Sequence, residues 1–177
     1  MTKELHISMF GGKEVPKLDL IRYYLKTKNY REIKPKEGRI TFEIKTSTIT
    51  QVKIYEYSDV QNVRNKDVAN NNLCVFIIFD MTNRKSFLDI LDKWIKFLRE
   101  VKYNNKIILF GVGKKEVLPV TDEKEINYLI SICKMDGEFH DLRNMEESDK
   151  CKLIDDLIES IFISARNINN KKDCNIF

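Results

Sequence analysis

Two apolar runs joined by an amphipathic segment constrain the fold of this chain more than any other feature. Leu73–Phe79 (LCVFIIF) is continuously apolar, and Lys106–Val112 (KIILFGV) is the second such run. Between them, apolar residues recur every three or four positions from Phe87 to Val101, which is the spacing of an amphipathic helix. Strands that are buried on both faces show such continuous apolar runs, as in parallel sheets. These segments therefore predict two central parallel strands connected by a helix.

The same alternation of strands and helices runs through the rest of the chain. Leu5–Phe10 is a strand candidate, and a helical pattern follows it after Pro16. Residues 39–57 contain two runs of alternating apolar and polar side chains, which predict an antiparallel hairpin with its turn near Ser47–Ile49. Two more helical patterns follow Val112, with a short strand candidate between them. The order predicts an α/β fold with a mostly parallel sheet, whose ligands bind at the carboxyl ends of the strands.

Charge, hydropathy and cysteine spacing exclude several classes of function. Lys plus Arg exceed Asp plus Glu by 31 − 27 = 4 charges, but they form no stripe, so no nucleic-acid partner is expected. The chain shows no secretory signal, and no apolar stretch approaches the roughly 20 residues that span a bilayer. The four cysteines show no CxxC spacing, so neither a disulfide framework nor a zinc site is expected. We expect a cytoplasmic protein.

The segment Phe79–Glu100 (FDMTNRKSFLDILDKWIKFLRE) carries a resemblance to a known family. A strand that ends in Asp-x-Thr-Asn, followed by a helix that opens with Ser-Phe and contains a Trp, resembles Rab-type sequences of the Ras superfamily of small GTPases. The order of elements agrees over about residues 3–165. The resemblance implies a P-loop small-GTPase-like domain at residues 1–166, with a six-stranded, mostly parallel sheet and about five helices. Residues 167–177 are expected to form a flexible tail.

The phosphate loop of that family, Gly-x-x-x-x-Gly-Lys-Ser/Thr, aligns with a stretch that keeps only part of its chemistry. Pro16 removes a backbone N–H that would face phosphate, and Leu18 replaces the hydroxyl that holds Mg²⁺. Glu14 adds negative charge to a loop that should surround anions. Since Pro suits the first turn of a helix, the stretch fits a plain strand–turn–helix joint better than a phosphate site. The candidate nucleotide-binding residues here are Gly11, Gly12, Lys13, Glu14, Val15, Pro16, Lys17 and Leu18.

The switch motifs of the family are altered as well. Asp-x-x-Gly falls at Glu56–Asp59, where Glu56 is a candidate metal ligand through a water and Asp59 replaces the glycine that senses the γ-phosphate. Val60 takes the place of the glutamine that positions water for hydrolysis. Residues 28–40, where the first switch is expected, contain neither Thr nor Ser. Different residue changes therefore affect metal binding and γ-phosphate sensing.

The base-recognition motif, Asn-Lys-x-Asp, maps onto Gly113–Glu116. Lys114 and Glu116 remain candidate base contacts, but the asparagine is absent, and the family's Ser-Ala-Lys maps near Leu142–Asn144 without a recognisable match. We expect a pseudo-GTPase with weak or lost GTP binding and very slow or absent hydrolysis. The alternative is a genuine GTP/GDP switch with Mg²⁺, which would use Lys17 on phosphate and Glu116 on guanine. No nucleophile–base set is apparent, so other enzyme chemistry is the least favoured.

The last four residues, Cys174-Asn-Ile-Phe, fit a Cys-a-a-X prenylation box, and a final Phe indicates a geranylgeranyl group. Together with the resemblance, this box predicts lipidation at Cys174 and peripheral attachment to the cytosolic face of a membrane, in vesicle trafficking or signalling. Effector or regulator proteins are expected to bind through the strand 39–57 hairpin. Tyr55 and Tyr57 are candidates for lining that surface.

Overall fold

The computed structural model describes residues 4–26, 28, 30–36, 39–44, 51–63, 65, 68, 72–133 and 137–173. Within these ranges the strands are β1 (Glu4–Phe10), β2 (Tyr30–Lys36), β3 (Arg39–Ile44), β4 (Gln51–Tyr57), β5 (Asn72–Asp80), β6 (Lys106–Val112) and β7 (Gly137–Asp141). The helices are α1 (Lys17–Lys26), α3 (Arg84–Asp89), the π-helical η2 (Ile90–Ile95), α4 (Lys96–Glu100), α5 (Glu123–Cys133) and α6 (Glu147–Asp173), with a 3₁₀ turn η1 (Val60–Asn62). Because α3, η2 and α4 follow one another without a break, they form a single long helix.

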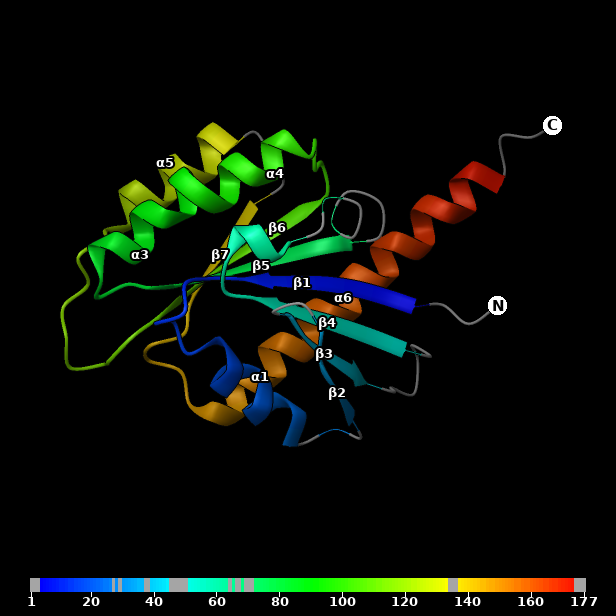
Figure 1. Ribbon diagram of the computed structural model, residues 1–177, viewed down its shortest axis with the longest axis horizontal. Helices are drawn as coiled ribbons and strands as arrows, with labels where there is room; N and C mark the ends of the chain where they lie inside the picture. Colours follow the sequence, from blue (N-terminus) through cyan, green and yellow to red (C-terminus); the bar gives the residue numbers. More distant parts are fainter. Residues whose placement is uncertain are drawn as a thin grey trace.

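All seven strands form one sheet, in the order β2-β3-β4-β1-β5-β6-β7. The five strands from β4 to β7 in that order run parallel, whereas β2, β3 and β4 pair antiparallel. Helices α1 and α6 cover one face of the sheet, and α3, α4 and α5 cover the other (Figure 1). The parallel strands therefore end at a common edge, and α6 ends at the opposite side of the sheet (Figure 1).

The α/β architecture and the hairpin predicted from the sequence are confirmed. Strands β3 and β4 pair antiparallel with Phe42 opposite Ile54 and Ile44 opposite Val52, and all four side chains are buried. The predicted turn at residues 47–49 lies outside the described residues. The apolar runs in β5 and β6 are buried and lie side by side at the centre of the sheet.

In the part of the chain that the structure describes, the sheet has seven strands rather than the six that the family resemblance implied. The additional strand is β2, which pairs with β3 at the edge of the sheet, where the first switch was expected. Its sequence, YREIKPK, is rich in charge and contains Pro35, both of which disfavour a central strand. An edge strand tolerates proline and lysine because one of its sides has no pairing partner. The described residues also contain four helices, counting α3–η2–α4 as one, against about five expected.

Two apolar clusters hold the layers together, one on each side of the sheet. The first lies under α1 and α6, and the second lies under the long helix α3–α4 and α5. Trp94, predicted as a core residue, is 2% exposed and stacks on Phe10 with ring centroids 4.8 Å apart. Helix α6 continues to Asp173, so residues 167–173, which were expected to begin a flexible tail, are helical.

Candidate functional site

The candidate phosphate-binding residues form the connection between β1 and α1, which we call the β1–α1 loop (Gly11–Lys17). A Cβ atom at Gly11 would lie 2.5 Å from the backbone oxygen of Ile78, so the loop leaves β1 in close contact with β5. A turn then follows, in which the Val15 N–H donates to the Gly12 carbonyl at 3.2 Å. Pro16 comes directly before α1, and its carbonyl accepts from the N–H of Leu20. The predicted strand–turn–helix joint is therefore present.

Lys17, the first residue of α1, points into the protein and is only 2% exposed. Its Nζ donates to the Gly12 carbonyl at 2.5 Å and lies 3.2 Å from Oε1 of Glu56. Burial lowers the pKa of Lys17 below its ordinary value of 10.5, although the carboxylates of Glu56 and Glu14 act in the opposite direction. The ammonium group that would meet phosphate in the family is thus engaged inside the chain.

Glu56, the candidate metal ligand, is the partner of this lysine. It lies on β4 opposite Met9 of β1 and is 4% exposed. The same oxygen that faces Lys17 accepts a hydrogen bond from Ser58 Oγ at 2.7 Å. Parallel pairing of β1 with β4 brings these groups together, because it puts the end of β4 beside the start of the β1–α1 loop. Ser58 was not singled out from the sequence, although its position two residues after Glu56 was the available signal.

Glu14 folds back over the β1–α1 loop. A Cβ atom built on Gly12 would lie 2.6 Å from Cδ of Glu14, so the carboxylate lies directly against the backbone of Gly12. Asp59, the residue in the place of the γ-phosphate-sensing glycine, caps the start of η1, and its side chain accepts a hydrogen bond from the N–H of Gln61 at 3.0 Å. Two carboxylates therefore stand beside the stretch where the family places phosphate oxygens.

A cleft of about 560 Å³ opens next to these carboxylates, between the β1–α1 loop, the η1 turn and the helix α3–η2. We call it the η1–α3 cleft. Lys93 in the cleft forms an ion pair with Asp89 at 2.8 Å. The cleft mixes both signs of charge. Its lining residues are Gly12, Lys13, Glu14, Ser58, Asp59, Val60, Gln61, Asn83, Lys85, Asp89, Lys93 and Trp94.

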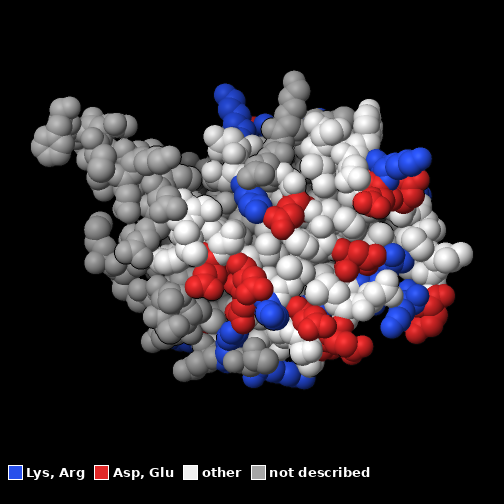
Figure 2. All heavy atoms as spheres, turned by 180° about the vertical axis from the view of Figure 1, so that it is seen from behind, with Lys and Arg blue, Asp and Glu red and all other residues white. Residues whose placement is uncertain are grey.

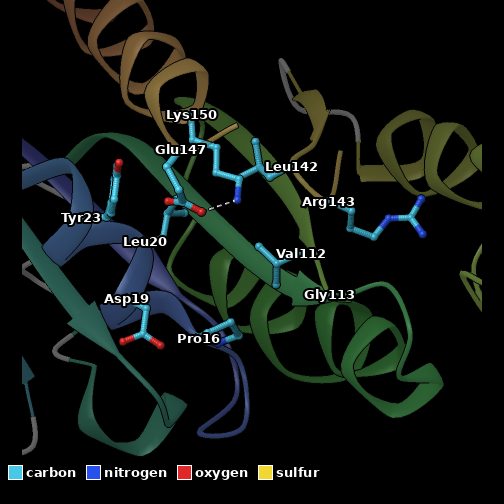
Figure 3. Close-up of a pocket in the computed structure, with 10 residues that line it drawn as sticks. All are labelled: Pro16, Asp19, Leu20, Tyr23, Val112, Gly113, Leu142, Arg143, Glu147 and Lys150. Atoms are coloured by element: carbon cyan, nitrogen blue, oxygen red, sulfur yellow. Dashed lines mark hydrogen bonds and ion pairs between the residues drawn. The ribbon is translucent and has the colours of Figure 1, made fainter. Parts of the chain in front are cut away.

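A second cavity, of about 330 Å³, lies at the same edge of the sheet on the side of α1 and α6. We call it the β6–α1 pocket. Three parts of the chain that are distant in the sequence meet there, namely the start of α1, the end of β6, and the turn after β7 together with the start of α6 (Figure 3). Its lining residues are Pro16, Asp19, Leu20, Tyr23, Val112, Gly113, Leu142, Arg143, Glu147 and Lys150. The pocket thus combines residues of the altered phosphate loop, the base motif and the segment near Leu142.

The charged side chains that line the β6–α1 pocket are largely paired with each other or with neighbours. Lys150 donates to Glu147 at 2.7 Å, and Arg143 extends away from the other lining residues (Figure 3). The Arg143 guanidinium donates three hydrogen bonds to the Asp141 carboxylate, the shortest at 2.7 Å. Partial burial opposes ionisation of Asp141, but the bonds from the side chain and backbone of Arg143 outweigh it and lower the pKa of Asp141.

The residues of the base-recognition motif, which follow β6, differ in whether they line the β6–α1 pocket. Gly113 lines the pocket and has φ of +139°, a backbone conformation that favours glycine, and a Cβ atom there would lie 2.8 Å from Oδ1 of Asp80. Lys114 and Glu116 are exposed and are absent from the lining of the pocket. The structure therefore brings Gly113, but neither candidate base contact, against the pocket.

Four further candidates have clear positions. Val15 is buried, and Leu18 is half-buried against the core under α1 and α6. Tyr57, a candidate for lining an effector surface, is fully buried and packs edge-on against Phe10, so that expectation was wrong. Tyr55 is partly exposed, and its hydroxyl lies 3.0 Å from Nδ1 of His6. Only Tyr55 of the two tyrosines can contribute to a surface.

Comparison with known proteins supports the family resemblance. No protein-family model matches the chain. The Ras-related protein RabV of Dictyostelium discoideum is 32% identical over 120 residues, which cover 64% of this chain and 51% of that protein. The chain therefore spans about half the length of the curated relative it matches. The resemblance to Rab-type small GTPases of the Ras superfamily, first seen in residues 79–100, is confirmed.

The remaining predictions concern metal, membrane and nucleic acid. Among the described residues, no group of three or more His, Cys, Asp or Glu side chains is arranged to hold a metal ion. In the part of the chain that the structure describes, no helix combines the length and apolar character needed to cross a bilayer. Cys174 lies outside the described residues. Figure 2 shows one face of the molecule, on which basic and acidic side chains are interspersed, and the expectation of no nucleic-acid partner stays a prediction.

Proposed function

We propose that this protein is a Rab-like pseudo-GTPase that acts at membranes, in vesicle trafficking or signalling, with weak or absent GTP binding and hydrolysis. The observation that carries the proposal is the buried contact between Lys17 and Glu56, with Nζ and Oε1 3.2 Å apart. In the family that the chain resembles, the corresponding lysine meets the phosphates of the nucleotide. Here the lysine already has an anionic partner that belongs to the protein.

The residues of this chain do not fit a magnesium–nucleotide complex of the family type. Leu18 has no ligand atom for Mg²⁺, and the Glu56 carboxylate is engaged by Lys17 and Ser58. Pro16 offers no N–H to a phosphate oxygen. A phosphate in the β1–α1 loop would also meet the carboxylate of Glu14. We therefore derive the function of the protein from its surface rather than from nucleotide turnover.

The proposed activity is recruitment. A domain that does not exchange nucleotide presents one fixed surface, which can bind effectors or sequester regulators of related GTPases. The hairpin 39–57 is the proposed contact surface, with Tyr55 as its partly exposed aromatic residue. Tyr55→Ala should weaken capture of a partner in a pull-down from cell extract, and unchanged capture would remove Tyr55 from the proposed surface.

The second candidate function is a GTP/GDP switch with non-standard contacts. The β6–α1 pocket favours it, because this pocket gathers the family's base-recognition segments around about 330 Å³ of space. The two candidates differ in whether the purified protein holds nucleotide.

Nucleotide content separates the two candidates. The chain is purified without added nucleotide, any ligand is released by heat and resolved by anion exchange, and fluorescent GDP and GTP are then titrated with and without Mg²⁺. A pseudo-GTPase should be empty and should show no binding up to high micromolar concentrations. Stoichiometric guanine nucleotide with Mg²⁺-dependent binding would overturn the proposal in favour of the switch.

Membrane attachment has a separate test at Cys174. A geranylgeranyl group there would be joined directly after the end of α6, which lies on the opposite side of the sheet from the β1–α1 loop (Figure 1). Cys174→Ser should release the protein from membranes in a fractionation experiment. Retention on membranes would show that the lipid is not the anchor.

A further inference from the structure

We propose that Glu56 and Glu14 are internal substitutes for phosphate: their carboxylates neutralise Lys17, close the β1–α1 loop and exclude phosphoanions. This inference rests on the proposed loss of nucleotide binding and assigns it to two residues. The inference adds a second cause to the altered motifs. The changes at Pro16 and Leu18 remove contacts that a nucleotide would need, whereas Glu56 and Glu14 supply carboxylates in the place of the phosphate.

The Lys17 ammonium group has hydrogen-bonding and charged partners inside the protein. Its side chain is almost fully buried and would be costly to keep charged without a partner. Two oxygens within 3.2 Å, the Gly12 carbonyl and Glu56 Oε1, meet that need. Ser58 donates to the same carboxylate oxygen and holds it in place. A phosphate oxygen could approach Nζ only by displacing Glu56.

Glu14 adds a second barrier, on the outer side of the loop. Loops that bind phosphate do so with backbone N–H groups that face the anion. In this loop the carboxylate of Glu14 covers Gly12, and the Gly12 carbonyl is turned to Lys17. Asp59 lines the adjoining η1–α3 cleft. An anion that reached the β1–α1 loop would therefore meet the exposed carboxylate of Glu14, whereas Lys17 is buried.

Removal of the two carboxylates should create binding that the wild-type protein lacks. The full chain is compared with Glu14→Gln/Glu56→Gln, and both are titrated with inorganic tripolyphosphate and with GDP by calorimetry, without Mg²⁺. Each carboxylate that is removed should strengthen tripolyphosphate binding by about tenfold or more, given the size of charge–charge interactions near a protein surface. Adding Lys17→Met to the double variant should abolish the gained binding.

A matched control separates a local effect from a change in net charge. Glu100→Gln/Glu159→Gln removes two exposed carboxylates from α4 and α6 and changes the net charge equally. If this control gains as much affinity as Glu14→Gln/Glu56→Gln, the inference is overturned. If the double variant does not fold, Glu14→Gln alone is measured, because Glu14 is exposed and its replacement should leave the core intact.

The outcomes distinguish the inference from the proposed function. An empty wild-type protein and a tripolyphosphate-binding double variant support both. An empty wild-type protein with an equally inert double variant overturns only the inference, since nucleotide binding is then lost for other reasons. Stoichiometric guanine nucleotide in the wild-type protein overturns both.

Discussion

Two regions at the carboxyl ends of the strands, the β1–α1 loop and the β6–α1 pocket, differ in how the protein's own side chains fill them. On the side of β4, the β1–α1 loop next to the η1–α3 cleft has Lys17 buried against Glu56, and the Glu14 carboxylate lies against Gly12. On the side of β6, a pocket of about 330 Å³ stays open between α1, β6 and α6. Both regions contain residues that align with nucleotide motifs of the family that the chain resembles. The β1–α1 loop is the one in which the aligned lysine is paired with a carboxylate of the protein.

The two regions differ in how strongly their charged residues depend on one another. Near the β6–α1 pocket, Lys114 and Glu116 are exposed and do not line the pocket. In the β1–α1 loop, Lys17 is buried, and its Nζ lies 3.2 Å from Oε1 of Glu56. Loss of one member of a buried pair leaves an uncompensated charge, whereas an exposed charge stays solvated. Substitutions at the two sides should therefore have effects of different size.

The largest effect is expected for Glu56→Gln. This change leaves the Lys17 ammonium buried without its counter-ion, and it should lower the free energy of unfolding by about 3–5 kcal/mol. Chemical denaturation followed by circular dichroism measures it. The double variant Lys17→Met/Glu56→Leu removes both charges and should stay within about 1 kcal/mol of wild type, because an apolar pair replaces a desolvated ion pair. Equal losses in the two variants would contradict an ion pair at this position.

Two neighbouring glycines give a sharper test of how the β1–α1 loop is packed. Gly11→Ala should lower the free energy of unfolding by about 1–3 kcal/mol, because its Cβ atom would meet the backbone oxygen of Ile78 at 2.5 Å. Gly12→Ala should cost less than about 1 kcal/mol, because only the flexible Glu14 side chain has to move. Thermal and chemical unfolding of both variants provide the comparison. A larger cost at Gly12 would mean that Glu14 is firmly held.

The smallest effect is expected on the base side, at Asp141. The pKa of this carboxyl is lowered from its ordinary value of 3.8 by hydrogen bonds from Arg143, which outweigh burial. A lowered carboxyl pKa adds stability above pH 3.8, and this contribution disappears as the pH falls through the lowered pKa. Because the pair is partly exposed, Asp141→Asn should cost about 1 kcal/mol or less at neutral pH. Denaturation curves at pH 7 and pH 2.5 should differ less for Asp141→Asn than for wild type.

Much of the fold could be predicted from local patterns. The continuous apolar runs gave β5 and β6, the alternating runs gave the β3–β4 hairpin, and the helical spacing gave the long helix that carries Trp94. Each of these signals lies within one element, where side-chain periodicity is set by the backbone geometry of that element. Strand β2 escaped prediction because Pro35 and its charged neighbours are compatible with a strand only at the edge of a sheet.

The candidate site, like the fold, could be predicted from the sequence only in part. The sequence is enough to show which ligand atoms of the family motifs are missing, because Leu18, Pro16 and Val60 lack the required groups wherever they lie. It gave no sign that Glu56 would face Lys17, that Glu14 would cover Gly12, or that Tyr57 would be buried. Those facts depend on β4 lying beside β1 in a particular register. They become visible only in the folded chain, because a contact between distant residues is set by how strands pair and not by the spacing of residues along the chain.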